Sequence, residues 1–238
     1  MIVCLDSGNS RIKWGVHDGQ QWLAQGAVAH AEVEQLRQLL SDWPHPVKVM
    51  LANVAGAEAG GRIREQLAPW RPAMQEVRSE HRRCGVTNQY LKPEQLGVDR
   101  WCALIGARGL SRTAAIVVMA GTATTIDTLD ADGNFLGGLI VPGFDLMLRS
   151  LARETAALPF ANGVYSPLPR GTDDAIVSGA LEAQAGAIER AFSRLGDADA
   201  QCLLSGGNAA RIGHLLVIPH SVTHNLPLEG LRQLALES

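Results

Sequence analysis

A pattern of three predicted strands occurs twice in the sequence, and this repeat constrains the fold more than any other feature. The first copy, IVCLDSGNSRIKWGVHDGQQWLAQGAV, lies at the N-terminus, and the second, IVVMAGTATTIDTLDADGNFLGGLIV, lies in the middle of the chain. In each copy an apolar strand ends in a glycine-containing turn, and an Asp-Gly pair marks a later hairpin turn. When the copies are aligned, Gly8 falls on Gly121, and Asp18-Gly19 falls near Asp132-Gly133. The repeat predicts two similar halves that arose by duplication.

Further elements follow each copy of the repeat. The periodicity predicts helices over 31–43, 62–70, 93–110, 144–157, 172–195, 208–214 and 228–237. It also predicts strands over 47–54, 73–77, 201–206 and 215–219, whereas residues 78–92 show no clear period. The sequence therefore predicts an α/β protein with one half over 1–112 and the other over 113–238, whose first turns face each other across a cleft.

Composition excludes several classes of protein. The 238 residues are 46% hydrophobic and 19% charged, with a net charge of −3, which is typical of a globular protein that does not coat nucleic acid. The one basic cluster, 78–83, includes an acid and is interpreted as a solvated loop. No apolar run is long enough to cross a bilayer, so we expect no membrane partner.

Cysteine usage favours a reducing cytoplasm. The four cysteines form no CxxC pair, which disfavours a zinc site. Cys4 and Cys202 lie in apolar runs and are expected in the core. The sequence leaves the reactivity of Cys84 and Cys102 open.

The two repeated turns carry the residue types that phosphate binding needs. A glycine turn lets backbone N–H groups approach a phosphate closely, and Asn9 and Ser10 add side-chain donors. Asp6, at a strand end, is suited to hold Mg²⁺, and Lys13 offers a positive charge. The second turn repeats the device with Gly121, Thr122, Thr124 and Thr125. Either turn alone could be an ordinary hairpin, but two in register favour a nucleotide clamp.

Four segments resemble the motifs of one enzyme family in order along nearly the whole chain. DSGNSRIK, LGVDRW, AGTATTID and GGLIVPG are similar to segments of the type III pantothenate kinases, and the context of Tyr90, Pro93 and Gly97 also fits. That family belongs to the superfamily of acetate and sugar kinases, heat-shock chaperones and actin. The resemblance implies an α/β fold of two duplicated ribonuclease-H-like halves with mixed sheets facing across a nucleotide cleft. Residues 1–112 would carry the first phosphate loop and the catalytic acid, and 113–238 the second phosphate loop and an adenine turn.

The resemblance also implies an activity, the ATP-dependent phosphorylation of pantothenate to 4′-phosphopantothenate, which begins coenzyme A synthesis. Asp99 would be the general base, and Arg100 would hold the pantothenate carboxylate. The positions that match the pantothenate pocket are Tyr90, Gly97, Val98, Asp99, Arg100 and Thr172. Thr172 would come from the neighbouring subunit of a homodimer. The alternative for Asp99 is a surface acid on a helix, which its position between Gly97-Val98 and Arg100-Trp101 in the first turns of the helix disfavours, and the alternative for Thr172 is a helix N-cap.

Nucleotide and cation sites follow from the same likeness. Residues implied in ATP binding are Asp6, Ser7, Gly8, Asn9, Ser10, Arg11, Ile12, Lys13, Gly121, Thr122, Thr124, Gly206 and Gly207, the last two in the SGGNAA turn on which adenine would pack. Asp6 would bind Mg²⁺, and Asp127 matches a position near a monovalent cation, K⁺ or NH₄⁺. The alternative for Asp127 is a hairpin acid that faces water.

The chain departs from the family pattern at Met119. Many members carry an aspartate there, just before the second phosphate segment, and the internal alignment places Met119 over Asp6. Metal binding would then rest on Asp6, with Asp127 as a substitute.

Two rival functions stay open: a non-catalytic ATP-binding regulator of gene expression, and another small-molecule kinase or phosphatase of the superfamily. Asp6, Asp99, Arg100 and Thr172 are all present. A regulator needs no base beside a carboxylate clamp, and a sugar kinase needs no clamp, so the set favours pantothenate.

Overall fold

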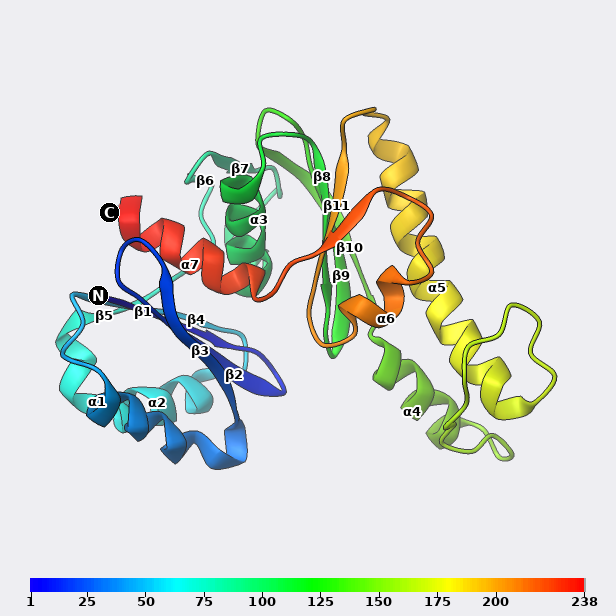
Figure 1. Cartoon of the computed structure of the whole chain (residues 1–238), viewed down its shortest axis with the longest axis horizontal. Coiled ribbons are helices and arrows are strands. Elements are labelled where there is room, and N and C mark those ends of the chain that lie inside the picture. The colour runs from blue at the N-terminus through cyan, green and yellow to red at the C-terminus, as the bar shows by residue number, and fades with distance from the viewer. Residues whose placement is uncertain (238) are drawn as a thin grey trace. The chain divides into compact units, whose positions relative to one another are not determined.

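The chain folds into two compact units in the computed structural model, which describes residues 1–237 (Figure 1). Unit 1 contains Met1–Arg112 together with the segment that begins at Asn225, and unit 2 contains Thr113–His224. Within residues 1–237, no helix is both long enough and apolar enough to span a membrane.

Each unit contributes five strands of a mixed sheet, and these five follow the same order in both units. In unit 1 the order is β3-β2-β1-β4-β5, and in unit 2 it is β10-β9-β8-β11-β12. The first three strands of each unit form an antiparallel meander, and the last two run parallel to the first. The strands of unit 1 are β1 Ile2–Ser7, β2 Arg11–His17, β3 Trp22–Ala29, β4 Lys48–Asn53 and β5 Met74–Glu76. Those of unit 2 are β8 Ala115–Ala120, β9 Ala123–Leu129, β10 Asn134–Pro142, β11 Gln201–Ser205 and β12 His220–Val222. The matching order confirms the predicted duplication.

The glycine turns occupy matching places in the two sheets. The Gly8 N–H donates to the carbonyl oxygen of Arg11 at 3.1 Å, and the Gly121 N–H donates to that of Ala123 at 3.1 Å. Each bond closes the hairpin between the first two strands of its unit. Met119 precedes its turn glycine by two residues, as Asp6 does, so the aligned positions are structurally equivalent.

Helices cover both faces of the sheet in unit 1. The longer ones are α2 Ala57–Gln66, α3 Val98–Leu110 and α7 Leu226–Glu237. Helices α3 and α7 lie side by side (Figure 1), and α7 also packs on β1, β2 and β4. The other elements are α1 Gln38–Asp42, 3₁₀ helices at His30–Arg37, Ala68–Ala73 and Pro93–Gln95, and a hairpin of β6 Arg82–Arg83 and β7 Val86–Asn88.

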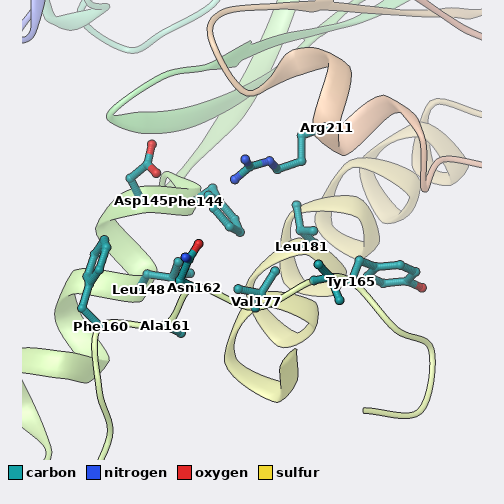
Figure 2. Close-up of a pocket in the computed structure, with 12 residues that line it drawn as sticks. Phe144, Asp145, Leu148, Phe160, Ala161, Asn162, Tyr165, Val177, Leu181 and Arg211 are labelled. Atoms are coloured by element: carbon teal, nitrogen blue, oxygen red, sulfur yellow. The ribbon is translucent and has the colours of Figure 1, made fainter. Parts of the chain in front are cut away.

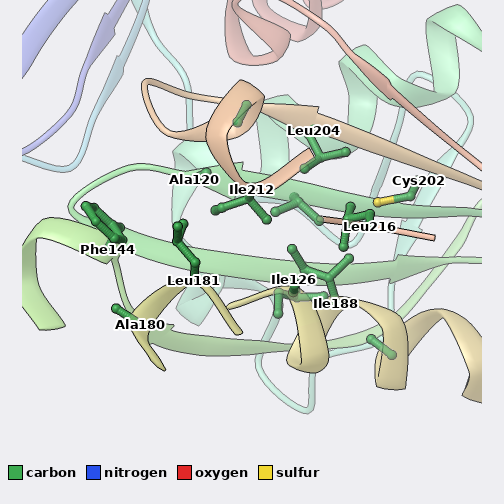
Figure 3. Close-up of a cluster of buried hydrophobic side chains, with 14 of the residues drawn as sticks. Ala120, Ile126, Phe144, Ala180, Leu181, Ile188, Cys202, Leu204, Ile212 and Leu216 are labelled. Atoms are coloured by element: carbon green, nitrogen blue, oxygen red, sulfur yellow. The ribbon is translucent and has the colours of Figure 1, made fainter. Parts of the chain in front are cut away.

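The core of unit 2 forms between its sheet and its helices. These helices are α4 Phe144–Glu154, α5 Thr172–Leu195 and α6 Ala209–Gly213. Figure 3 shows Ile126 of β9 and Ile188 of α5 within one cluster of buried side chains that also includes Leu204 and Ile212. Since Ile126 and Ile188 are at most 1% exposed, α5 is held firmly against the sheet.

Three expectations about the elements need correction. The predicted strand at 215–219 is wrong: two backbone N–H groups there donate to carbonyl oxygens of the last two residues of α6, and the strand begins after Pro219. The closing helix packs with unit 1, whereas the predicted division placed residues 228–237 in the second half. The predicted helix at 31–43 is mostly a 3₁₀ helix.

Candidate active site

Asp6 is a buried carboxylate at the end of β1. It is 7% exposed, and its Oδ1 atom has no hydrogen-bond partner among the described residues. Burial raises the pKa of Asp6 to about 6, with a smaller raising effect from the charge of Asp99 and a lowering effect from Lys13, which lies opposite Asp6 on β2. The two carboxylates are therefore close enough to interact. A buried carboxylate oxygen without a partner, in a side chain that interacts with a second carboxylate, fits a ligand to a cation.

Asp99 lies in the first turn of α3, and Gly97 is the N-cap residue of this helix. The Asp99 Oδ1 atom accepts a hydrogen bond from the N–H of Arg100 at 2.8 Å, and Trp101 donates its N–H to the Gly97 carbonyl oxygen at 3.0 Å. A Cβ at position 97 would lie 2.7 Å from Asp99 Oδ1. Glycine at 97 therefore leaves room for the carboxylate beside the helix terminus. Val98, between them, is half-buried.

Arg100 is buried and directed at Tyr90. Arg100 is only 4% exposed, and its Nη1 atom donates a hydrogen bond to the Tyr90 hydroxyl at 3.0 Å. The Arg100 guanidinium carbon lies 5.7 Å from the centroid of the Tyr90 ring. Asp6 thus interacts electrostatically with Lys13 and Asp99. Arg100 contacts Tyr90 directly.

Asn88 is a site-organising residue that the sequence interpretation missed. It is 1% exposed, accepts the Tyr90 N–H through Oδ1 at 3.1 Å, and donates from Nδ2 to the Pro93 carbonyl oxygen at 3.0 Å. These two bonds fix the loop that carries Tyr90. Residues 78–92 show no periodic signal that would point to Asn88, although an Asn in such a stretch is the residue type whose side chain bonds to nearby backbone.

The second of the two turns predicted to bind phosphate is held by the segment that follows β10. Gly143 donates its N–H to the Thr122 carbonyl oxygen at 3.0 Å, and a side chain at 143 would overlap the carbonyl oxygen of Gly121. Within residues 1–237, the hydroxyls of Thr124 and Thr125 are buried and have no hydrogen-bond partner. Hydroxyls without partners beside a glycine turn are suited to donate to a group that binds from outside.

Asp127 is fully buried, so the alternative of a water-facing acid is wrong. It lies in the middle of β9, opposite Val117 on β8 and Gly138 on β10. Because side chains alternate along a strand, Asp127 shares a face with Thr125, opposite the face on which Ile126 packs against the helices.

The turn predicted to contact adenine packs on the end of β8. Gly206 has a φ of +104°, and a side chain there would overlap the carbonyl oxygen of Ala120. Asn208 donates its backbone N–H to that oxygen at 3.2 Å, and its side chain donates to Asp145 Oδ2 at 3.2 Å. Gly207 faces open space. The turn therefore presents backbone at Gly207, next to the second phosphate turn.

Two hollows lie along α4 and α5. Figure 2 shows the first, of about 410 Å³, where the Arg211 guanidinium stacks 4.6 Å from the centroid of the Phe144 ring. The second, of about 570 Å³, is lined by Thr172 and by mostly apolar residues that include Met147, Leu151 and Ile176. Thr172 is the first residue of α5, Gly171 is the N-cap, and no side chain caps the helix. The N-cap alternative for Thr172 is therefore wrong.

Comparison with known proteins decides the family. The sequence model of type III pantothenate kinases matches residues 2–194. The chain belongs to the type III pantothenate kinase family. It is 72% identical over 238 residues to a type III pantothenate kinase of Dechloromonas aromatica (strain RCB), and the match covers all of both chains. It is 52% identical to another from Aromatoleum aromaticum (strain DSM 19018 / LMG 30748 / EbN1), with 100% of this chain and 98% of the relative covered.

Solved structures agree with this family in fold. A conserved putative Baf family transcriptional activator from Campylobacter jejuni aligns with a TM-score of 0.65 at 17% identity, covering 99% of this chain and 98% of that one. A putative 2-dehydro-3-deoxygalactonokinase from Sinorhizobium meliloti aligns with a TM-score of 0.56 at 13% identity, covering 99% and 97%. At such identities the likeness shows the fold alone, an α/β architecture consistent with duplicated ribonuclease-H-like halves.

Proposed function

We propose that the chain transfers the γ-phosphoryl group of ATP to the hydroxyl of pantothenate, which gives 4′-phosphopantothenate and ADP in the first step of coenzyme A synthesis. The observation that carries this proposal is the 72% identity, over the whole of both chains, to a type III pantothenate kinase. Unit 1 supports it independently, because it holds an acid for the hydroxyl proton and a buried arginine for a carboxylate.

Asp99 is the general base of the proposed reaction. The hydroxyl proton passes to its carboxylate as the hydroxyl oxygen forms a bond to the γ-phosphorus, and the bond from that phosphorus to the β–γ bridging oxygen breaks. Its Oδ1 atom already accepts the Arg100 N–H, which fixes the carboxylate and leaves the other oxygen to face a substrate.

Arg100 holds the pantothenate carboxylate in this proposal, with Tyr90, Gly97 and Val98 beside it. A guanidinium offers two parallel N–H donors to a carboxylate. The hydrogen bond from Arg100 Nη1 to the Tyr90 hydroxyl fixes the direction of the fork, and the burial of Arg100 strengthens its attraction for an anion. The clamp then sets the distance between the acid end of the substrate and the hydroxyl near Asp99.

A kinase of this family uses ATP and a divalent cation, and we propose that Asp6 holds Mg²⁺. The unpartnered, buried Oδ1 atom is suited to this ligand role. Bound Mg²⁺ supplies positive charge against the phosphate oxygens. Because Met119 occupies the equivalent place in unit 2, we assign that role to Asp6, and the burial of Asp127 leaves it suited to the monovalent cation, K⁺ or NH₄⁺.

The two turns are proposed to bind the phosphates of ATP, and the 206–207 turn to support adenine. Lys13, half-buried and opposite Asp6, brings a positive charge to the first turn. The hydroxyl of Thr124, which has no hydrogen-bond partner among residues 1–237, lies beside the second turn. The proposed nucleotide-binding set comprises Asp6, Ser7, Gly8, Asn9, Ser10, Arg11, Ile12, Lys13, Gly121, Thr122, Thr124, Gly206 and Gly207.

A homodimer with a shared active site is part of the proposal. Thr172 borders an apolar hollow of about 570 Å³ between α4 and α5. Large apolar side chains nearby are exposed, among them Phe160 at 61% and Leu168 at 82%. Apolar surface of this kind is typical of interfaces between subunits, and a second copy that covers it would receive Thr172 in its pantothenate pocket.

We also propose a cytoplasmic location. The cysteines are all unpaired, and three of the four are buried. Unpaired thiols agree with a reducing compartment, where disulfides are rare.

One assay tests the function against both rivals. Purified protein is supplied with MgATP and K⁺ and with a panel of hydroxy acids and sugars, and ADP release is measured. We expect release with pantothenate and none with the sugars. Release with a sugar alone would assign a different kinase, and nucleotide binding without turnover on any acceptor would favour the regulator.

A further inference from the structure

His30, the residue that follows strand β3, contacts the first phosphate turn. Its Nε2 atom lies 2.7 Å from the carbonyl oxygen of Gly8. Because a carbonyl oxygen only accepts hydrogen bonds, Nε2 carries the proton and donates it. The bond therefore joins the end of β3 to the turn between β1 and β2.

The sheet register places His30 at this position. Arg11 pairs with Ala29, the last residue of β3, in the antiparallel ladder of β2 and β3, so the residue that follows Ala29 comes beside the residues that precede Arg11. His30 is half-buried there, at the start of the 3₁₀ helix that follows β3. Ala29, one residue earlier, is in the strand, where successive side chains project from opposite faces.

The bond to Gly8 fixes the direction of the next amide. In a planar trans peptide the C=O and the N–H point in opposite directions. With the Gly8 carbonyl held toward His30, the N–H of Asn9 is directed away from His30. Among residues 1–237 this N–H has no acceptor, and Asn9 is exposed. Glycine at 8 gives this peptide freedom to rotate, and the imidazole removes that freedom.

We infer that His30 is a positioning residue that presents the Asn9 amide to a phosphate of the nucleotide. The inference rests on the proposed function, since it assumes that the first turn binds phosphate. His30 does not touch the nucleotide itself. The hydrogen bond from His30 lowers the free-energy cost of ordering the turn on nucleotide binding, because the Asn9 N–H is already oriented to donate to an anion.

Three variants test this role through the dissociation constant of MgADP, measured by isothermal titration calorimetry. His30→Phe keeps a ring of similar size without a donor, and His30→Gln keeps a donating N–H. We expect His30→Phe to weaken MgADP binding about three- to tenfold, the range of one lost hydrogen bond, and His30→Gln to stay within about twofold of the native protein. His30→Asn, which is polar but too short to reach Gly8, should behave like His30→Phe and replaces it if that variant does not fold.

His45 provides a matched control in the same unit. Its Nε2 atom lies 3.1 Å from the carbonyl oxygen of Pro69, away from every predicted site residue. His45→Phe should leave the MgADP constant unchanged. In steady-state kinetics, His30→Phe should raise the KM for ATP and leave the KM for pantothenate unchanged.

Several results would overturn the inference. These are tight MgADP binding by His30→Phe, a failure of His30→Gln to restore binding, or an equal loss in His45→Phe. Because MgADP binding needs no acceptor, the native protein can fail to phosphorylate pantothenate while the His30 result still stands. Conversely, pantothenate kinase activity with no effect of His30→Phe rejects the role of His30 alone.

Discussion

Gly230 of α7 rests directly on the backbone of Cys102 in α3. A Cβ at position 230 would overlap the carbonyl oxygen of Cys102, and one at Gly106 would overlap that of Leu226. The two helices approach closely because each has a glycine at the contact. Since α3 carries Asp99 and Arg100 in its first turn, α7 sets the depth at which the proposed catalytic helix lies against the sheet.

Gly230→Ala should therefore destabilise the protein. The methyl group forces the helices apart, and overpacking of this kind costs about 1–3 kcal/mol in free energy of unfolding. Urea denaturation measures the change. The control is Gly61→Ala in α2, where nothing lies within 4 Å of the added Cβ, and where alanine should stabilise the helix by about 0.5–1 kcal/mol. A Gly230→Ala protein as stable as the native one would contradict the close contact.

Asp99→Asn should lower kcat by a factor of about 10²–10⁴, the usual contribution of a general base, because the amide keeps the shape but cannot accept the proton. MgADP binding and thermal stability should be retained. Glu58→Gln, a change to an exposed acid in the first turn of α2, should have no effect on kcat. A near-native kcat for Asp99→Asn at saturating substrates would reject the assignment of the base.

Arg100→Lys should raise the KM for pantothenate far more than it lowers kcat. Lysine keeps the charge but loses the two-pronged geometry and the bond to Tyr90, and we expect an increase of about 10- to 100-fold. Arg108→Lys is the control, because Arg108 is also buried in α3 but donates to the backbone carbonyl of Arg112. An unchanged KM for pantothenate in Arg100→Lys would place the carboxylate elsewhere.

Asp6 should make stability depend on pH. Folding raises its pKa from 3.8 to about 6, so the folded state binds a proton more tightly than the unfolded chain. The stability that this preference gives is complete below about pH 4 and is lost as pH rises through about 6. The difference of about two pKa units corresponds to about 3 kcal/mol. Without divalent cation, Asp6→Asn should thus stabilise the protein more at pH 8 than at pH 5, while it abolishes kinase activity.

Asp18→Asn should change the pH dependence of stability in the opposite direction, so it serves as the control for Asp6→Asn. Hydrogen bonds from the N–H groups of Gln21 and Gln20 hold the pKa of Asp18 below its usual value. Its stabilising effect is therefore present at pH 8 and is lost as pH falls. An Asp6→Asn variant that is destabilised at pH 8 would show that the buried carboxylate is compensated by groups other than Lys13.

The proposed shared site can be tested with mixed subunits. A Thr172→Arg chain and an Asp99→Asn chain should each be inactive as homodimers. In a mixed dimer, one site carries both lesions and the other carries neither, so part of the activity should return after subunit exchange. Light scattering checks the dimer itself. Verified exchange without recovered activity would mean that each chain builds its site alone.

The repeated pattern predicted the sheets correctly because each meander carries its own signals. Alternation, the glycine turns and the Asp-Gly pairs are local, and they fix three strands in each unit without reference to the rest of the chain. The confirmed expectation that Cys4 and Cys202 are buried has the same origin, since both lie in apolar strands.

The failed strand at 215–219 shows where apolar content misleads. Leu216 is buried in the core of unit 2, yet its N–H donates to Gly213 in a turn rather than to a neighbouring strand. The real strand, β12, consists of three exposed residues, His220–Val222. Apolar residues in this segment indicate burial against the sheet. They do not indicate strand pairing, which depends on where the backbone lies.

Parts of the candidate site could not be predicted because they depend on the register between strands that lie apart in the sequence. A single histidine at 30 has no periodic signal, and its bond to Gly8 follows only from the pairing of Arg11 with Ala29. Similarly, an amphipathic closing helix does not reveal which sheet it covers. By contrast, Asp99 and Arg100 lie in one short motif, so both were identified as candidates from the sequence.

The place of α7 has a consequence for the order in which a newly made chain matures. The ribosome synthesises the whole of unit 2, from Thr113 to His224, before it synthesises α7, so unit 1 lacks this helix until unit 2 has been made. Domains usually fold in the order of their synthesis. Here the unit that begins the chain is completed last, and a product cut short by premature termination would leave the surface of α3 around Gly106 uncovered. A nascent chain can therefore bring α7 against α3, the helix that carries Asp99, only after unit 2 has been synthesised.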